Sequence, residues 1–85
     1  MAQVEIPTRL LARTGGTSRL EVEGRNVRQV LRALDEQFPG LVDELKATTA
    51  IAIDGEIIGQ RLEDAVLERV EPDSEVYFIP AVAGG

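Results

Sequence analysis

The sequence predicts an α+β fold in which a mixed sheet of about four to five strands packs on one main helix. Three observations support this fold class. Apolar and polar residues alternate near the N-terminus and again over residues 75–80, which is typical of strands with one buried face. Residues 27–38 carry apolar side chains at the three- and four-residue spacing of an amphipathic helix. The dipeptide Asp54-Gly55 lies within an apolar segment and favours a tight hairpin turn.

Two strands are expected before the helix, joined as a hairpin. Residues 4–11 (VEIPTRLL) place apolar side chains at even spacing and predict the first strand. Pro7 lies inside this segment. Because proline cannot donate to a sheet ladder, we expect a bulge there, or a position that faces away from the neighbouring strand. The glycine-containing segment 13–18 predicts the turn, and residues 19–24 (RLEVEG) predict the second strand.

The main helix is expected to begin after Asn26 and to end before Pro39. The Asn26 side chain can cap the first turn, and Gln29 can reach back in the manner of a capping box. Proline and the residue before it disfavour the helical conformation, so the helix ends there. Residues 41–45 (LVDEL) are expected to add one short turn that packs inward.

The second half of the chain predicts three further strands. Residues 50–58 (AIAIDGEII) predict two of them, one on each side of the hairpin turn. In the connection that follows, residues 62–67 predict a helical turn and residues 72–74 (PDS) predict a tight turn. Residues 75–80 (EVYFIP) predict the last strand.

Composition limits the chemistry that the side chains can perform. The chain has 85 residues, 44% of them hydrophobic and 28% charged, so we expect one small domain over residues 1–79 and a flexible tail over residues 80–85. Cysteine and histidine are absent, which excludes disulfides, thiolate nucleophiles, imidazole bases and the usual zinc sites. The acidic residues at 63–64 and 73–75 are interpreted as surface and turn residues. We therefore expect no metal site and no bound cofactor.

Charge and hydropathy exclude two classes of partner. The net charge is −6, no basic stripe is present, and the sequence has only one tyrosine and two phenylalanines, so nucleic acid is not an expected partner. No segment approaches the roughly 20 apolar residues that a membrane span needs, and the N-terminus lacks the pattern of a signal peptide. We therefore expect a cytoplasmic protein that binds no membrane.

The sequence ends in PAVAGG (residues 80–85), which carries no polar side chain. Chain ends often fray, so one interpretation gives this tail no role. The other starts from the C-terminal carboxylate, which is ionised at neutral pH and becomes a good electrophile only after activation, for instance as a mixed anhydride with a nucleotide phosphate. An activating enzyme would receive it in a narrow channel. Gly84 and Gly85 make the slimmest possible chain, and six extended residues span roughly 20 Å.

The last strand predicts a surface beside this tail. Alternation indicates that Val76 and Phe78 face the helix, whereas Tyr77 and Ile79 face outward. Two large apolar side chains next to the tail favour a docking patch for a partner protein. The alternative is that Tyr77 and Ile79 only cover the sheet.

Four segments together resemble a known family: VEIPTRLLARTGG, VRQVLRALDEQFPGLVDEL, IAIDGEII and PDSEVYFIPAVAGG. They are similar to the ubiquitin-like sulfur carriers of the MoaD/ThiS type, which include the molybdopterin synthase small subunit and the thiazole sulfur carrier. The resemblance covers essentially the whole chain. It implies a β-grasp (ubiquitin-like) fold.

The resemblance also implies a mechanism in which the protein is a carrier and substrate, not an enzyme, although it could be the small subunit of a sulfur-transferring complex. An adenylyltransferase of the ubiquitin-activating type uses ATP to adenylate the terminal glycine, and a sulfurtransferase or other persulfide donor converts it to a thiocarboxylate. In this sequence the reacting carboxylate is that of Gly85, with Gly84 as the slim approach. The threaded segment is Pro80, Ala81, Val82 and Ala83.

The resemblance leaves several functions open. The sulfur acceptor could be an enzyme of molybdopterin, thiamine or cysteine biosynthesis, or of a specialised metabolite. A ubiquitin-like protein modifier would begin with the same adenylate but transfer the glycine to a lysine amine. A non-catalytic β-grasp interaction module would bind through Tyr77 and Ile79 and leave the tail inert.

Overall fold

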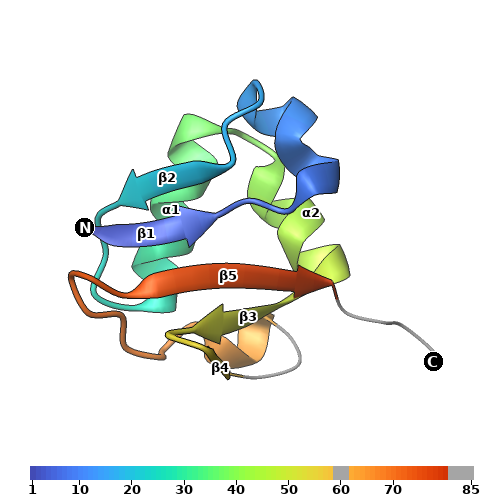
Figure 1. The fold of residues 1–85 in the computed structure, drawn as a ribbon. Coiled ribbons are helices and arrows are strands. Elements are labelled where there is room, and N and C mark those ends of the chain that lie inside the picture. The colour runs from blue at the N-terminus through green and yellow to red at the C-terminus, as the bar shows by residue number, and fades with distance from the viewer. Residues whose placement is uncertain (59–61, 81–85) are drawn as a thin grey trace.

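The computed structural model describes residues 1–58 and 62–80, and it shows one sheet with helices packed against one of its faces (Figure 1). The sheet has five strands in the order β2-β1-β5-β3-β4. The strands are β1 (Ala2–Glu5), β2 (Arg19–Val22), β3 (Thr49–Ile53), β4 (Glu56–Ile57) and β5 (Glu75–Pro80). The helices are α1 (Val27–Gln37) and α2 (Leu41–Thr48), with the shorter 3-10 helices η1 (Thr8–Thr14) and η2 (Leu62–Ala65).

The sheet is mixed, as the sequence predicts. β5 lies in its centre, parallel to β1 and antiparallel to β3. The hairpin partners β2 and β4 pair antiparallel with β1 and β3 and form the two edges. The α+β prediction with a mixed sheet on a main helix is confirmed.

The core lies between the sheet and the two α-helices. Leu34 of α1, Leu41 and Leu45 of α2, and Ile51 of β3 are fully buried there. Fully burying a side chain of this size contributes about 1.5–3 kcal/mol, so this layer carries much of the stability of so small a domain. Neither α-helix covers the other face of the sheet (Figure 1).

The start of the structure differs from the prediction of a first strand over residues 4–11. β1 ends at Glu5, and Pro7 precedes the 3-10 helix η1. Because Pro7 has no N–H to donate, the antiparallel ladder to β2 cannot continue through it. Leu10 and Thr14, four residues apart, are buried instead on the helical turns.

The cap of α1 forms nearly as predicted. The Asn26 side chain accepts a hydrogen bond from the Gln29 backbone N–H at 2.9 Å. The Gln29 side chain returns to the backbone N–H of Arg25 at 2.8 Å, one residue before the position that a standard capping box uses. The segment before α1 also pairs with the segment before β5 here, since the Val70 N–H donates a hydrogen bond to the Arg25 carbonyl at 2.9 Å.

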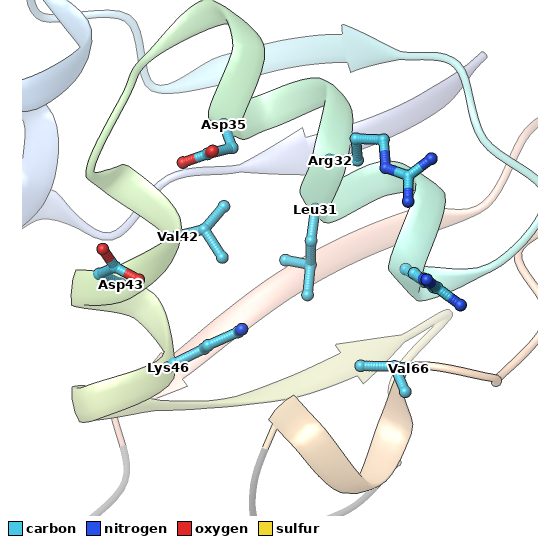
Figure 2. A pocket seen from close by; sticks show the side chains of 8 residues that line it. Leu31, Arg32, Asp35, Val42, Asp43, Lys46 and Val66 are labelled. Carbon is cyan, nitrogen blue, oxygen red and sulfur yellow. The ribbon is translucent and has the colours of Figure 1, made fainter.

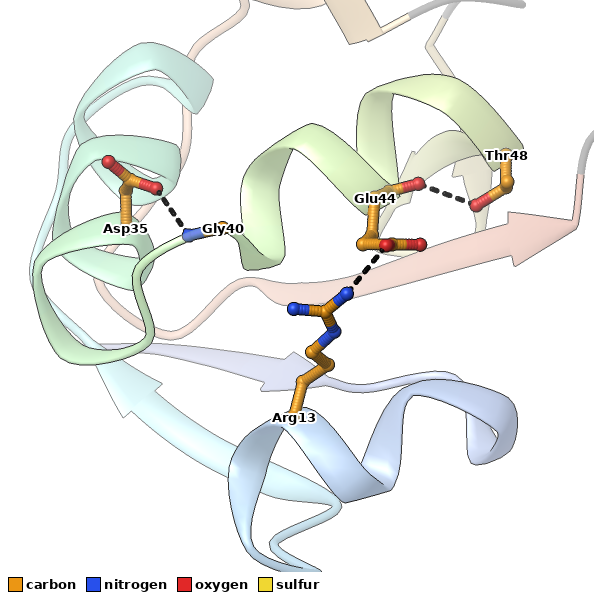
Figure 3. A network of polar contacts seen from close by, with 5 residues as sticks. All are labelled: Arg13, Asp35, Gly40, Glu44 and Thr48. Atoms are coloured by element: carbon orange, nitrogen blue, oxygen red, sulfur yellow. Dashed lines mark hydrogen bonds and ion pairs between the residues drawn. The ribbon is translucent and has the colours of Figure 1, made fainter.

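The second helix is longer than the single turn expected at residues 41–45. α2 runs from Leu41 to Thr48, and β3 begins at the next residue. Figure 3 shows contacts that hold α2 in place: Arg13 of η1 forms a 2.8 Å ion pair with Glu44, and the Gly40 N–H donates to the Asp35 carboxylate at 3.4 Å. The Thr48 hydroxyl donates to the Glu44 carbonyl at 2.6 Å (Figure 3).

The hairpin turn at Asp54-Gly55 is confirmed. Both residues have positive φ, 50° and 86°, as a tight two-residue hairpin turn requires. The Asp54 carboxylate accepts hydrogen bonds from the Ser74 hydroxyl at 3.0 Å and the Glu75 N–H at 2.9 Å. It thereby fastens the hairpin to the turn that precedes β5.

Two absences hold for the described residues 1–58 and 62–80. Their helices are too short, or too polar, to cross a lipid bilayer. They also contain no group of three or more acidic residues placed to hold a metal ion.

Candidate functional site

The candidate site is the sheet face that the α-helices leave open, called the outer face below. Its geometry follows from the alternation in β5. Val76 and Phe78 are buried against the helices, whereas Tyr77 is exposed and Ile79 half-buried on the opposite side. The predicted orientation of Tyr77 and Ile79 is therefore confirmed.

Cross-strand pairing extends this surface beyond β5. Ala52 of β3 lies opposite Tyr77, Ala50 lies opposite Ile79, and Ile57 of β4 lies opposite Ala52. Since paired residues share a face of the sheet, these five side chains form one surface. We call Ala50, Ala52, Ile57, Tyr77 and Ile79 the apolar patch.

The apolar patch has a low floor and two prominent side chains. Ala50 and Ala52 are buried, whereas Ile57 is 63% exposed and Tyr77 36% exposed. The exposed apolar area of the patch therefore comes mainly from Ile57 and Tyr77. Exposed apolar groups gathered in this way are typical of protein interaction sites.

Sequence reasoning missed Ile57, Ala50 and Ala52. The signal for Ile57 was present, since a two-residue turn at Asp54-Gly55 sets a register in which Ala52 opposes Ile57. The two alanines gave no signal, because all five residues of β3 are buried and its sequence does not alternate between apolar and polar residues.

A charged rim borders the patch on the β1 and β2 side. Glu5 of β1 lies beside Tyr77, and it forms a 3.5 Å ion pair with Arg19 of β2. Arg19 also reaches Glu75 at 3.5 Å. All three side chains are substantially exposed, so they contribute little to stability. An apolar centre with a polar rim is the usual anatomy of a protein interface.

The predicted tail adjoins this surface. Pro80, assigned to the tail by the sequence, is the last residue of β5 and lies opposite Thr49. It follows Ile79 of the apolar patch directly. Ala81, Val82, Ala83, Gly84 and Gly85 lie outside the described residues.

Comparison with known proteins assigns the chain to a family. The sequence model of the ThiS family matches residues 4–85. The chain belongs to the ThiS family. Members of this family are small ubiquitin-like sulfur carrier proteins.

One relative of this ThiS-family chain is similar in sequence over most of its length. The molybdopterin synthase sulfur carrier subunit of Pyrenophora tritici-repentis is 32% identical over 72 residues, which are 85% of this chain and 76% of the relative.

Solved structures confirm the predicted β-grasp fold. The Amycolatopsis orientalis BexX/CysO complex contains a chain that matches with a TM-score of 0.82 and 22% identity, covering 100% of both chains. Mycobacterium tuberculosis CysO matches with a TM-score of 0.83 and 22% identity, over 96% of this chain and 100% of that one. Small archaeal modifier protein 1 of Methanosarcina acetivorans matches with a TM-score of 0.78 and 23% identity, over 99% and 95% of the two chains.

Proposed function

We propose that this ThiS-family chain carries sulfur as a thiocarboxylate on Gly85, formed after an activating enzyme docks on the apolar patch. The observation that supports it most directly is the position of the patch on β5. The strand that presents Tyr77 and Ile79 to solvent ends at Pro80, only five residues before Gly85. An enzyme that holds the patch therefore has the terminal carboxylate within reach of a nearby active site.

The first chemical step is adenylation. A carboxylate oxygen of Gly85 attacks the α-phosphorus of ATP, and pyrophosphate leaves. The product is an acyl adenylate, whose carbonyl carbon is now electrophilic because AMP is a good leaving group. This chain supplies the carboxylate, and the adenylyltransferase supplies ATP and the groups that bind it.

Sulfur transfer then needs a persulfide and one further thiol. The terminal sulfur of the persulfide attacks the acyl carbon and displaces AMP, which gives an acyl disulfide. A second thiol attacks the donor's sulfur in that disulfide, so that a disulfide remains on the donor side and the thiocarboxylate is released. Since this chain has no cysteine, neither sulfur atom of the disulfide left on the donor side comes from its side chains.

The chain thus acts as substrate and carrier, and its partners perform the catalysis. Gly84 and Gly85 pass through the narrowest part of the enzyme's channel because they lack side chains. Ala81, Val82 and Ala83 form the threaded segment behind them. The acceptor enzyme belongs to molybdopterin, thiamine, cysteine or specialised-metabolite synthesis. The relative named as a molybdopterin synthase subunit favours the first of these.

Intact-mass spectrometry tests this function. The protein is incubated with ATP, the adenylyltransferase and a persulfide donor, and its mass should rise by the difference between one sulfur and one oxygen atom. Deleting Gly85 should abolish both the mass change and ATP–pyrophosphate exchange while the fold is kept. An unchanged mass with an adenylyltransferase shown to be active on another carrier would refute the proposal. Conjugates to lysine in place of the thiocarboxylate would identify a protein modifier.

A further inference from the structure

A hollow on the helix side of the sheet combines an apolar floor with unpaired charges. It has a volume of about 470 Å³ and lies where α1, α2 and the loop after η2 meet (Figure 2). Leu31, Val42 and Val66 supply its apolar surface. Leu31 and Val42 are buried and Val66 is half-buried, so the floor is continuous with the core. We call this hollow the helix groove.

The walls of the helix groove are fixed by hydrogen bonds. The Arg28 N–H donates to the Val66 carbonyl at 2.9 Å, which ties the loop to the start of α1. At the other end, the Leu41 N–H donates to the Phe38 carbonyl at 3.0 Å, across the short connection between α1 and α2. A groove that exists before binding costs a ligand little ordering energy.

Three cations line the helix groove without a partner of their own. Arg28, Arg32 and Lys46 form no ion pair and no side-chain hydrogen bond with any other described residue. Elsewhere among the described residues, Arg13, Arg19 and Arg69 each pair with a glutamate, whereas Arg9 and Arg25 form no ion pair.

Of the five cations that form no ion pair among the described residues, three line this one groove, although the chain has 15 acidic and 9 basic residues. Arg28 and Arg32 are four residues apart on α1, so they are neighbours on one helix face. The three cations outnumber the two aspartates of the same lining, which leaves the groove with a formal charge of +1 on a protein of net charge −6, and its basic side can attract an anionic group.

The acidic and basic groups of the helix groove are partly separated. Asp35 and Asp43 lie on one side of Leu31 and Arg32 lies on the other (Figure 2), whereas Lys46 follows Asp43 on α2. The Lys46 side chain extends between α2 and the apolar floor (Figure 2). A ligand with negative charge along its whole length would meet the two aspartates, which repel it, whereas one whose negative charge is confined to the side of Arg28 and Arg32 would not. A ligand with localised negative charge beside an apolar group fits both features.

We propose that the helix groove binds a short acidic peptide segment of a partner protein. One aliphatic or aromatic side chain of the peptide packs on Leu31, Val42 and Val66, and one or two neighbouring carboxylates pair with Arg28 and Arg32. This interaction surface is separate from the apolar patch and does not depend on sulfur chemistry at Gly85.

Peptide display followed by a binding measurement tests the proposal. Random dodecapeptides are selected against the wild-type protein, and the consensus is synthesised with a fluorescent label for anisotropy titration. We expect the consensus to carry Asp or Glu next to Leu, Ile or Phe. The double variant Arg28→Glu/Arg32→Glu should bind it about tenfold or more weakly, and binding to the wild type should weaken as salt is raised.

The matched control is Arg9→Glu/Arg25→Glu, which makes the same change in net charge with two exposed arginines outside the groove. It should bind the consensus within about twofold of wild type, and circular dichroism should show that both double variants fold. Selection of no peptide, a consensus without acidic residues, or equal loss of binding in both double variants would overturn the proposal. So would a peptide whose binding is lost in Ile57→Ala, because that peptide occupies the apolar patch.

Discussion

Ile57 offers the sharpest test of the apolar patch. Complete burial of an isoleucine side chain is worth about 1.5–3 kcal/mol. In the free protein Ile57 is 63% exposed, so a partner that covers it can gain about 1–2 kcal/mol. Since 1.4 kcal/mol corresponds to a tenfold change in affinity, Ile57→Ala should weaken docking about tenfold. Less than half of the Ile57 side chain is buried in the free protein. Ile57→Ala should therefore lower the free energy of unfolding by no more than about 1 kcal/mol.

ATP–pyrophosphate exchange with the adenylyltransferase measures this effect. If the patch contributes docking energy alone, KM for the carrier should rise about tenfold while kcat stays unchanged. Leu67→Ala is the matched control, because Leu67 is 80% exposed in the loop after η2 and lies outside the patch. An unchanged KM for Ile57→Ala, or an equal rise for Leu67→Ala, would refute the assignment of this face as the docking surface.

Two further variants test the surface and its support. Ile79→Asp should raise KM in the same exchange assay far more than it lowers the thermal midpoint, since Ile79 is only half-buried on the outer face; a collapse of stability would assign Ile79 to the core. Asp54→Ala should lower the free energy of unfolding in urea by about 1–3 kcal/mol, because it removes the acceptor for Ser74 and Glu75 and puts alanine at a φ of 50°. Asp54→Asn keeps an acceptor and tolerates that φ, so it should cost less, and equal losses would contradict this account.

The sequence predicted those elements in which one short-range pattern determines the outcome. The alternation in residues 75–80 has a period of two, so it could only place Tyr77 and Ile79 opposite Val76 and Phe78. The spacing within residues 27–38 and the Asn26 cap likewise determine α1 locally. In each case the local preference agrees with the packing of the whole fold.

Prediction failed where tertiary packing chooses between patterns. Val4, Ile6 and Leu10 have even spacing, yet Leu10 is buried from a helical turn because Pro7 ends the ladder. β3 is buried throughout, so its sequence could not tell which residues face the apolar patch. The helix groove was not predicted at all, since Arg28, Lys46 and Val66 are brought together only by the packing of three separate elements.

The apolar patch and the helix groove lie on opposite sides of the sheet, so a partner on one leaves the other accessible. In the proposed function the carboxylate reacts on one protein, and this arrangement lets a second protein hold the carrier at the same time. It also separates the two proposals in experiment. Arg28→Glu/Arg32→Glu should leave KM in the exchange assay near the wild-type value, because neither arginine touches the outer face. If that double variant raises KM as much as Ile57→Ala, the activating enzyme spans both surfaces and the groove serves adenylation.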